Sequence, residues 1–148
     1  MMTLRFCIAV LHLLALAIGI AAAYARWRAL KKVKATADLP AVFFADNWYG
    51  IAFLIWVVTG SVRAFGGLEK GTAYYLESHW FLGKMGLLAI VLALEIMPMV
   101  TLFRWRMALK KGGLIDLGKT PLLARLTFLE LPLLLLIVLM AAAMARGL

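Results

Sequence analysis

The sequence is short of cysteine and of charged residues. Its 148 residues include one cysteine, Cys7, and only 16% of them are charged. A single cysteine excludes a disulfide within the chain, and no Cys/His cluster with the spacing of a zinc site is present. The sequence also lacks a Ser/His/Asp set, an HExxH motif and a phosphate-binding loop, which argues against a hydrolase or a nucleotide-dependent enzyme. Soluble domains carry about 25% charged residues, so an ordinary soluble globule is excluded.

Apolar residues dominate instead, at 66% of the chain. Four apolar stretches approach the ~20 residues that a helix needs to cross a bilayer, and they cover residues 4–25, 47–65, 80–103 and 121–145. The first stretch could also be a secretory signal, but the basic cluster that follows it is typical of a retained span. We therefore predict an all-α protein, an integral membrane four-helix bundle, with residues 1–148 forming a single transmembrane domain surrounded by membrane lipids.

Positive charge is distributed unevenly along this chain. The chain has sixteen Lys and Arg but only seven Asp and Glu, and the basic residues concentrate in the ranges 26–34 and 104–119. Basic loops stay in the cytoplasm, so both termini and the range 66–78 should lie outside. The predicted location is the bacterial inner (cytoplasmic) membrane, as a multi-pass protein. The same hydropathy leaves no role for nucleic acid as a partner.

Polar side chains within the spans recur at helical spacing, which predicts that they face the interior of the bundle. On the first span, His12 shares a face with the small residues Ala15, Gly19 and Ala23, which favour close helix packing. At 1.5 Å per residue, the polar groups fall into two layers. The outer layer contains His12, Thr59, Arg63 and Lys84, with His79 at its rim. The inner layer contains Asp46, Tyr49, Glu95 and Glu130, near Arg104 and Arg125.

These groups have a structural and a functional interpretation. Buried ion pairs could simply fix the helix register. Alternatively, the outer layer could bind a haem b or a similar anionic redox cofactor, with His12 as the axial metal ligand and with Arg63 and Lys84 near the propionates. We expect at most one axial histidine, because His79 lies at a different depth.

Two further hypotheses come from other functional classes. Thiolate, thioether and imidazole groups in the outer half could carry or store Cu(I), and the candidate ligands are Cys7, His12, Met85, Met140 and Met144. Methionine is also common filler in apolar helices. The chain could instead be a non-catalytic accessory subunit of a larger membrane complex, or form a homo-oligomer, because its small-residue faces suit helix association.

The sequence also resembles known families. Asp46-x-x-Tyr49-Gly50, Thr59-Gly60-x-x-Arg63, Tyr74-Tyr75, Phe81-x-x-Lys84, Pro98, Trp105 and the closing Met144-Ala145-Arg146-Gly147 resemble an uncharacterised bacterial family of four-span membrane proteins. This is the domain-of-unknown-function family numbered twenty-two fourteen, and the resemblance implies fold and membrane location. His12 within Val10-Leu11-His12-Leu13-Leu14, with Lys84, is more distantly similar to the haem-dependent membrane protoporphyrinogen oxidases and to copper-resistance D-type proteins. That similarity implies a haem-ligand role for His12 and a functional role for Lys84.

Overall fold

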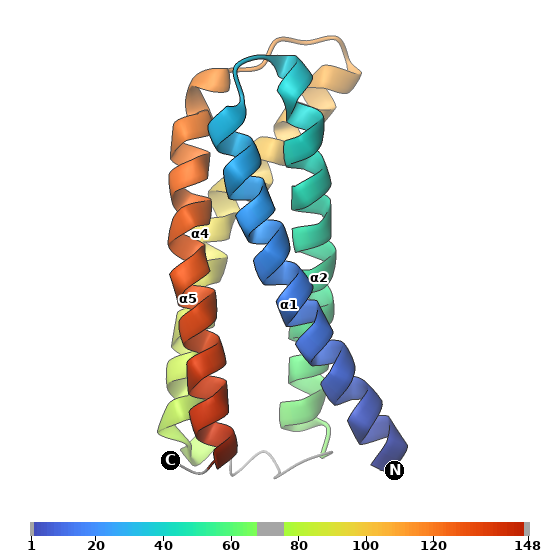
Figure 1. Cartoon of the computed structure of the whole chain (residues 1–148), viewed down its shortest axis with the longest axis vertical. Helices are drawn as coiled ribbons and strands as arrows, with labels where there is room; N and C mark the ends of the chain where they lie inside the picture. Colours follow the sequence, from blue (N-terminus) through green and yellow to red (C-terminus); the bar gives the residue numbers. More distant parts are fainter. Residues whose placement is uncertain (1, 68–75, 147–148) are drawn as a thin grey trace.

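The protein is a bundle of four long helices. The computed structural model describes residues 2–67 and 76–146, with helices α1 (Met2–Lys32), α2 (Leu39–Phe65), α4 (His79–Lys110) and α5 (Thr120–Arg146) (Figure 1). Each of the four is long and apolar enough to cross a membrane. The predicted all-α membrane bundle is confirmed.

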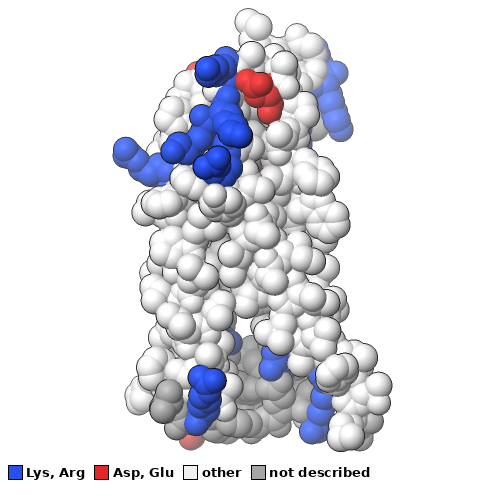
Figure 2. Space-filling view, viewed as in Figure 1, with Lys and Arg blue, Asp and Glu red and all other residues white. Residues whose placement is uncertain are grey.

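The two ends of the bundle differ in what they carry. The start of α1 and the end of α5 lie at the same end, and the connections that precede α2 and α5 lie at the opposite end (Figure 1). Lys and Arg side chains gather at that opposite end, where α1 finishes and α5 starts (Figure 2). We call this the basic end. Its cytoplasmic orientation remains a prediction from the charge pattern.

The helices extend past the apolar stretches that marked them. Helix α2 begins at Leu39, well before residue 47, and Pro40 lies in its first turn, where a missing N–H costs no helical hydrogen bond. Helices α1 and α4 continue to Lys32 and Lys110. Hydropathy marks only the segment that lies in lipid. The helix itself continues until a residue interrupts its pattern of backbone hydrogen bonds. After α4 that residue is Gly112, whose φ of 68° favours glycine.

Three apolar clusters lie within the bundle: one is central, one is at the basic end, and a small one contains Ala64 and Phe81. The central cluster includes the small residues of α1, and a Cβ added at Gly19 would lie 3.7 Å from Ala52 Cβ. Ala15 and Ala23 are buried on the same face, so α1 approaches α2 through small residues. The basic-end cluster contains Leu30, Leu39, Val42, Leu102, Trp105, Leu123 and Ala124. On each helix one buried or half-buried charged residue lies in sequence between the central and the basic-end cluster: Arg26, Asp46, Glu95 and Glu130.

Candidate functional site

Arg26 is the centre of a buried charge cluster. Its side chain is 0% exposed and lies on the packing face of α1, one turn after Ala22 and one turn before Leu30. Nη1 donates to Asp46 Oδ1 at 2.9 Å and to Glu95 Oε1 at 2.7 Å. Nη2 donates to Glu95 Oε2 at 2.5 Å and to Glu130 Oε2 at 3.1 Å. One guanidinium therefore joins α1 to all three other helices.

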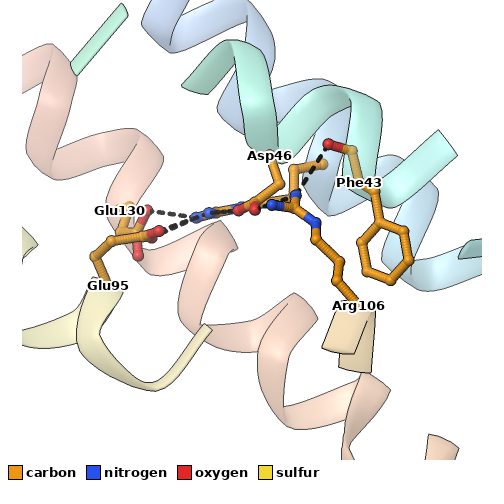
Figure 3. A network of polar contacts seen from close by, with 6 residues as sticks. Phe43, Asp46, Glu95, Arg106 and Glu130 are labelled. Carbon is orange, nitrogen blue, oxygen red and sulfur yellow. Dashed lines mark hydrogen bonds and ion pairs between the residues drawn. The ribbon is translucent and has the colours of Figure 1, made fainter. Parts of the chain in front are cut away.

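A second guanidinium extends the cluster toward the basic end. Nη2 of Arg106 donates to Asp46 Oδ2 at 2.6 Å and to the backbone carbonyl of Phe43 at 3.1 Å. Asp46 is thus held between two arginines, while Glu95 receives a two-pronged contact from Arg26, the strongest geometry for such a pair. Figure 3 shows Asp46 and Arg106 on one side of the network and Glu95 and Glu130 on the other.

The cluster contains more negative than positive charge. Asp46, Glu95 and Glu130 supply three carboxylates, and their described ion pairs run to two guanidiniums, those of Arg26 and Arg106. Fully ionised, the cluster would carry one unbalanced negative charge in a segment that lies within apolar spans. Such a charge is costly in lipid.

Glu130 is the carboxylate least satisfied by its surroundings. Its side chain is 0% exposed, and its Oε1 atom has no hydrogen-bond partner. The hydroxyl of Tyr49 is also buried without a hydrogen bond, while the ring of Tyr49 packs 4.4 Å from the Arg26 guanidinium carbon. The unused oxygen of Glu130 can therefore accept a proton without breaking a hydrogen bond of the cluster.

The structure brings together Asp46, Glu95 and Glu130, the acidic residues predicted for the inner layer. The arginines that contact them are not the two that the sequence predicted. Arg104 and Arg125, the expected neighbours, are exposed. Arg26 and Arg106 pair with the carboxylates instead. The sequence pattern places Arg26 among the loop charges, because the apolar stretch ends at residue 25. Its spacing from Gly19 and Ala22 on the buried face of α1 is the signal that could have found it.

Of the predicted outer-layer residues, His12 and Thr59 are in contact. Nδ1 of His12 lies 2.9 Å from Thr59 Oγ1 and 3.1 Å from the carbonyl oxygen of Trp56, and the imidazole stacks on the Trp56 ring. The Thr59 hydroxyl lies 2.6 Å from the carbonyl of Ile55, to which it donates. Nδ1 must then be the donor in its own contacts, which places the proton of a neutral ring on Nδ1.

The other outer-layer residues lie on α2 and α4. Arg63 and Lys84 are half-buried, and Lys84 Nζ lies 5.1 Å from the centre of the Phe81 ring. His79 is exposed at the start of α4. Thus the predicted outer residues occupy two helices besides α1, and the charge cluster is a distinct site.

The proposed copper ligands lie on three helices, α1, α4 and α5. Within residues 2–67 and 76–146, no group of three or more His, Cys, Asp or Glu could hold a metal ion. Cys7 and Met85 are exposed, and Met140 Cε fills the space beside Gly83. Met140 therefore packs α5 against α4.

One comparison with known proteins gave a match. A family model described as "Predicted membrane protein (DUF2214)" matches residues 4–148. This confirms the family resemblance seen in the sequence. No curated protein and no solved structure matches the chain, so the more distant similarities to oxidases and copper-resistance proteins stay predictions.

Proposed function

The chain belongs to the DUF2214 family of predicted membrane proteins, and we propose that this protein binds and releases a proton at its buried charge cluster. The observation that carries the proposal is the excess carboxylate, with Glu130 fully buried and its Oε1 atom unpaired. A proton on Glu130 would neutralise the cluster. Intramembrane carboxylates of this kind serve as proton relays in pumps and transporters.

The helices that carry the two glutamates are also built to bend near them. Pro98 follows Glu95 on α4 and Pro132 follows Glu130 on α5, each within one helical turn and inside its helix. Proline lacks the N–H that would bond to the carbonyl four residues earlier, and its ring pushes that carbonyl away, so the helix tends to kink at this point. A change in charge at either glutamate therefore acts beside a weak point in the helix.

This combination supports a proton-coupled function. With Glu130 ionised, Arg26 draws α5 toward α1, and with Glu130 neutral that attraction weakens while Glu95 keeps its two-pronged contact. The movement of one proton would then change how α5 packs against its neighbours. Proton-coupled transport is the class of function that uses such a change.

Infrared spectroscopy of the purified protein across a range of pH tests the proposal. The wild-type protein should show the carbonyl stretch of a protonated carboxyl group that disappears as the pH rises. Glu130→Gln should lack this band and remain folded, because glutamine mimics the neutral side chain. Glu77→Gln, at an exposed position outside the bundle, is the matched control and should keep it. A wild-type spectrum without the band at any pH, or a band that persists in Glu130→Gln, would contradict the proposal.

A second candidate function is haem binding at the outer layer. It is favoured by the Nδ1 contacts of His12, because metal-ligating histidines use one ring nitrogen to donate to a carbonyl and thereby orient the other. A b-type haem supplies one-electron redox chemistry, and here His12 would ligate its iron while Arg63 and Lys84 would lie toward its propionates. Purified protein reconstituted with haem should show a Soret band that shifts in His12→Ala. The same spectrum in both proteins would remove this candidate.

The Cu(I) and accessory-subunit hypotheses can be tested on the same preparation. Copper passage or storage predicts stoichiometric copper after loading, with loss on replacement of Cys7 and His12. An accessory role predicts that the chain purifies from its native membrane as a stoichiometric part of a larger complex. Recovery of the chain alone, without copper, would dispose of both.

A further inference from the structure

A groove opens at the basic end between the last turns of α1 and the first turns of α5. Its volume is about 650 Å³, within the range of ~300–1,000 Å³ that is usual for small-molecule sites. Its lining includes Trp27, Lys31, Thr120, Arg125 and Phe128. None of these residues belongs to the buried charge cluster.

The groove combines an apolar wall with two cations. The rings of Trp27 and Phe128 pack against each other with their centroids 5.1 Å apart and so connect α1 to α5. Lys31 and Arg125, one from each helix, are exposed on the same groove, and Lys31 Nζ lies 5.2 Å from the centre of the Trp27 ring. The first turn of α5 adds the positive end of a helix dipole. Figure 2 shows further Lys and Arg side chains gathered at this end of the bundle.

We infer that this groove binds one anionic phospholipid, with its phosphate between Lys31 and Arg125 and an acyl chain along Trp27 and Phe128. The charges at the rim complement a phosphodiester, and basic pockets between transmembrane helices are known sites for acidic headgroups. The aromatic pair lies where a helix leaves the apolar layer, and so matches the junction between the headgroup and the acyl chains. A free phosphate ion would leave the apolar wall unused.

Native mass spectrometry of the full chain in detergent, titrated with phosphatidylglycerol, tests this inference. Each basic residue near an anionic lipid surface contributes roughly 1 kcal/mol, so the double variant K31A/R125A should weaken the first bound lipid about thirtyfold. Phosphatidylcholine, whose headgroup is neutral overall, should bind much more weakly than phosphatidylglycerol to the wild-type protein. Inorganic phosphate at millimolar concentration should not displace the lipid.

The matched control is R104A/K110A, which removes two exposed charges from α4 at the same end. It should bind phosphatidylglycerol within a few-fold of wild type. The inference is overturned if K31A/R125A binds like this control, if both lipids bind equally, or if inorganic phosphate competes effectively. Because Lys31 and Arg125 are exposed, both proteins should fold, and circular dichroism of each verifies this. The result does not depend on proton binding at Glu130.

Discussion

Replacing Arg26 by alanine should be among the most destabilising substitutions in this protein. The change removes the hydrogen bonds from Arg26 to Asp46, Glu95 and Glu130. It also leaves these carboxylates with Arg106 as their one described cation, on Asp46 alone. Breaking a buried ion pair by removing one partner costs about 3–5 kcal/mol, because an uncompensated charge remains. We expect Arg26→Ala to lower the free energy of unfolding by this amount.

The measurement is equilibrium unfolding in mixed micelles with increasing SDS, followed by helical circular dichroism. Arg28→Ala, at an exposed position two residues along α1, should change stability by less than about 0.5 kcal/mol. Adding Glu95→Gln and Glu130→Gln to Arg26→Ala should recover most of the loss, since the penalty comes from the stranded carboxylates. If Arg26→Ala and Arg28→Ala were equally stable, or if the glutamines gave no recovery, the cluster would not be the electrostatic centre of the bundle.

Three further predictions concern the outer layer and the orientation. His12→Ala should lower the free energy of unfolding by about 1–3 kcal/mol in the same assay, since it removes the contacts of Nδ1 with Thr59 and Trp56 and the stacking on the Trp56 ring; an unchanged protein would mean that these contacts are weak. Gly60→Ala places a Cβ 3.1 Å from His12 Cε1 and should destabilise, whereas Gly50→Ala meets nothing within 4 Å and should stabilise by roughly 0.5–1 kcal/mol; equal effects would refute the packing. In a cysteine-free background, Ala35→Cys should react with an impermeant thiol reagent only after cell lysis, whereas Glu77→Cys, at an exposed position of the range 66–78, should react in intact cells; the reverse pattern would invert the topology.

Much of the architecture could be predicted because lipid imposes simple constraints. A backbone in hydrocarbon must satisfy its own hydrogen bonds, so four apolar stretches of bilayer length specify four helices. The high cost of an intramembrane charge likewise directed Asp46, Glu95 and Glu130 to the interior, where all are buried or half-buried. The small residues Ala15, Gly19 and Ala23 marked the packing face of α1 for the same reason.

The pairing within the cluster could not be predicted from charge and hydropathy alone. The basic residues after residue 25 read as loop charges, and nothing in the composition separates Arg26 from Arg28. Only the continuation of α1 to Lys32 puts Arg26 on the buried face and Arg28 outside. In the same way, Arg106 and Arg104 lie two residues apart on α4, and helix geometry turns only Arg106 toward Asp46.

The charge imbalance bears on whether the cluster serves only to hold the helices together. A cluster with that sole role would be most stable if its charges cancelled, and apolar residues of similar volume would often do as well. Here a third carboxylate is placed where two guanidiniums are already engaged, with one oxygen of Glu130 unpaired. Prolines weaken α4 and α5 just beyond the two glutamates. These features lower the stability of a cluster that only holds helices together. In a site that gains and loses a proton, the same features make the packing of α5 depend on the charge of Glu130. Glu130→Gln should therefore raise stability above wild type at high pH and leave it unchanged at low pH, and equal stability at both would favour the purely structural role.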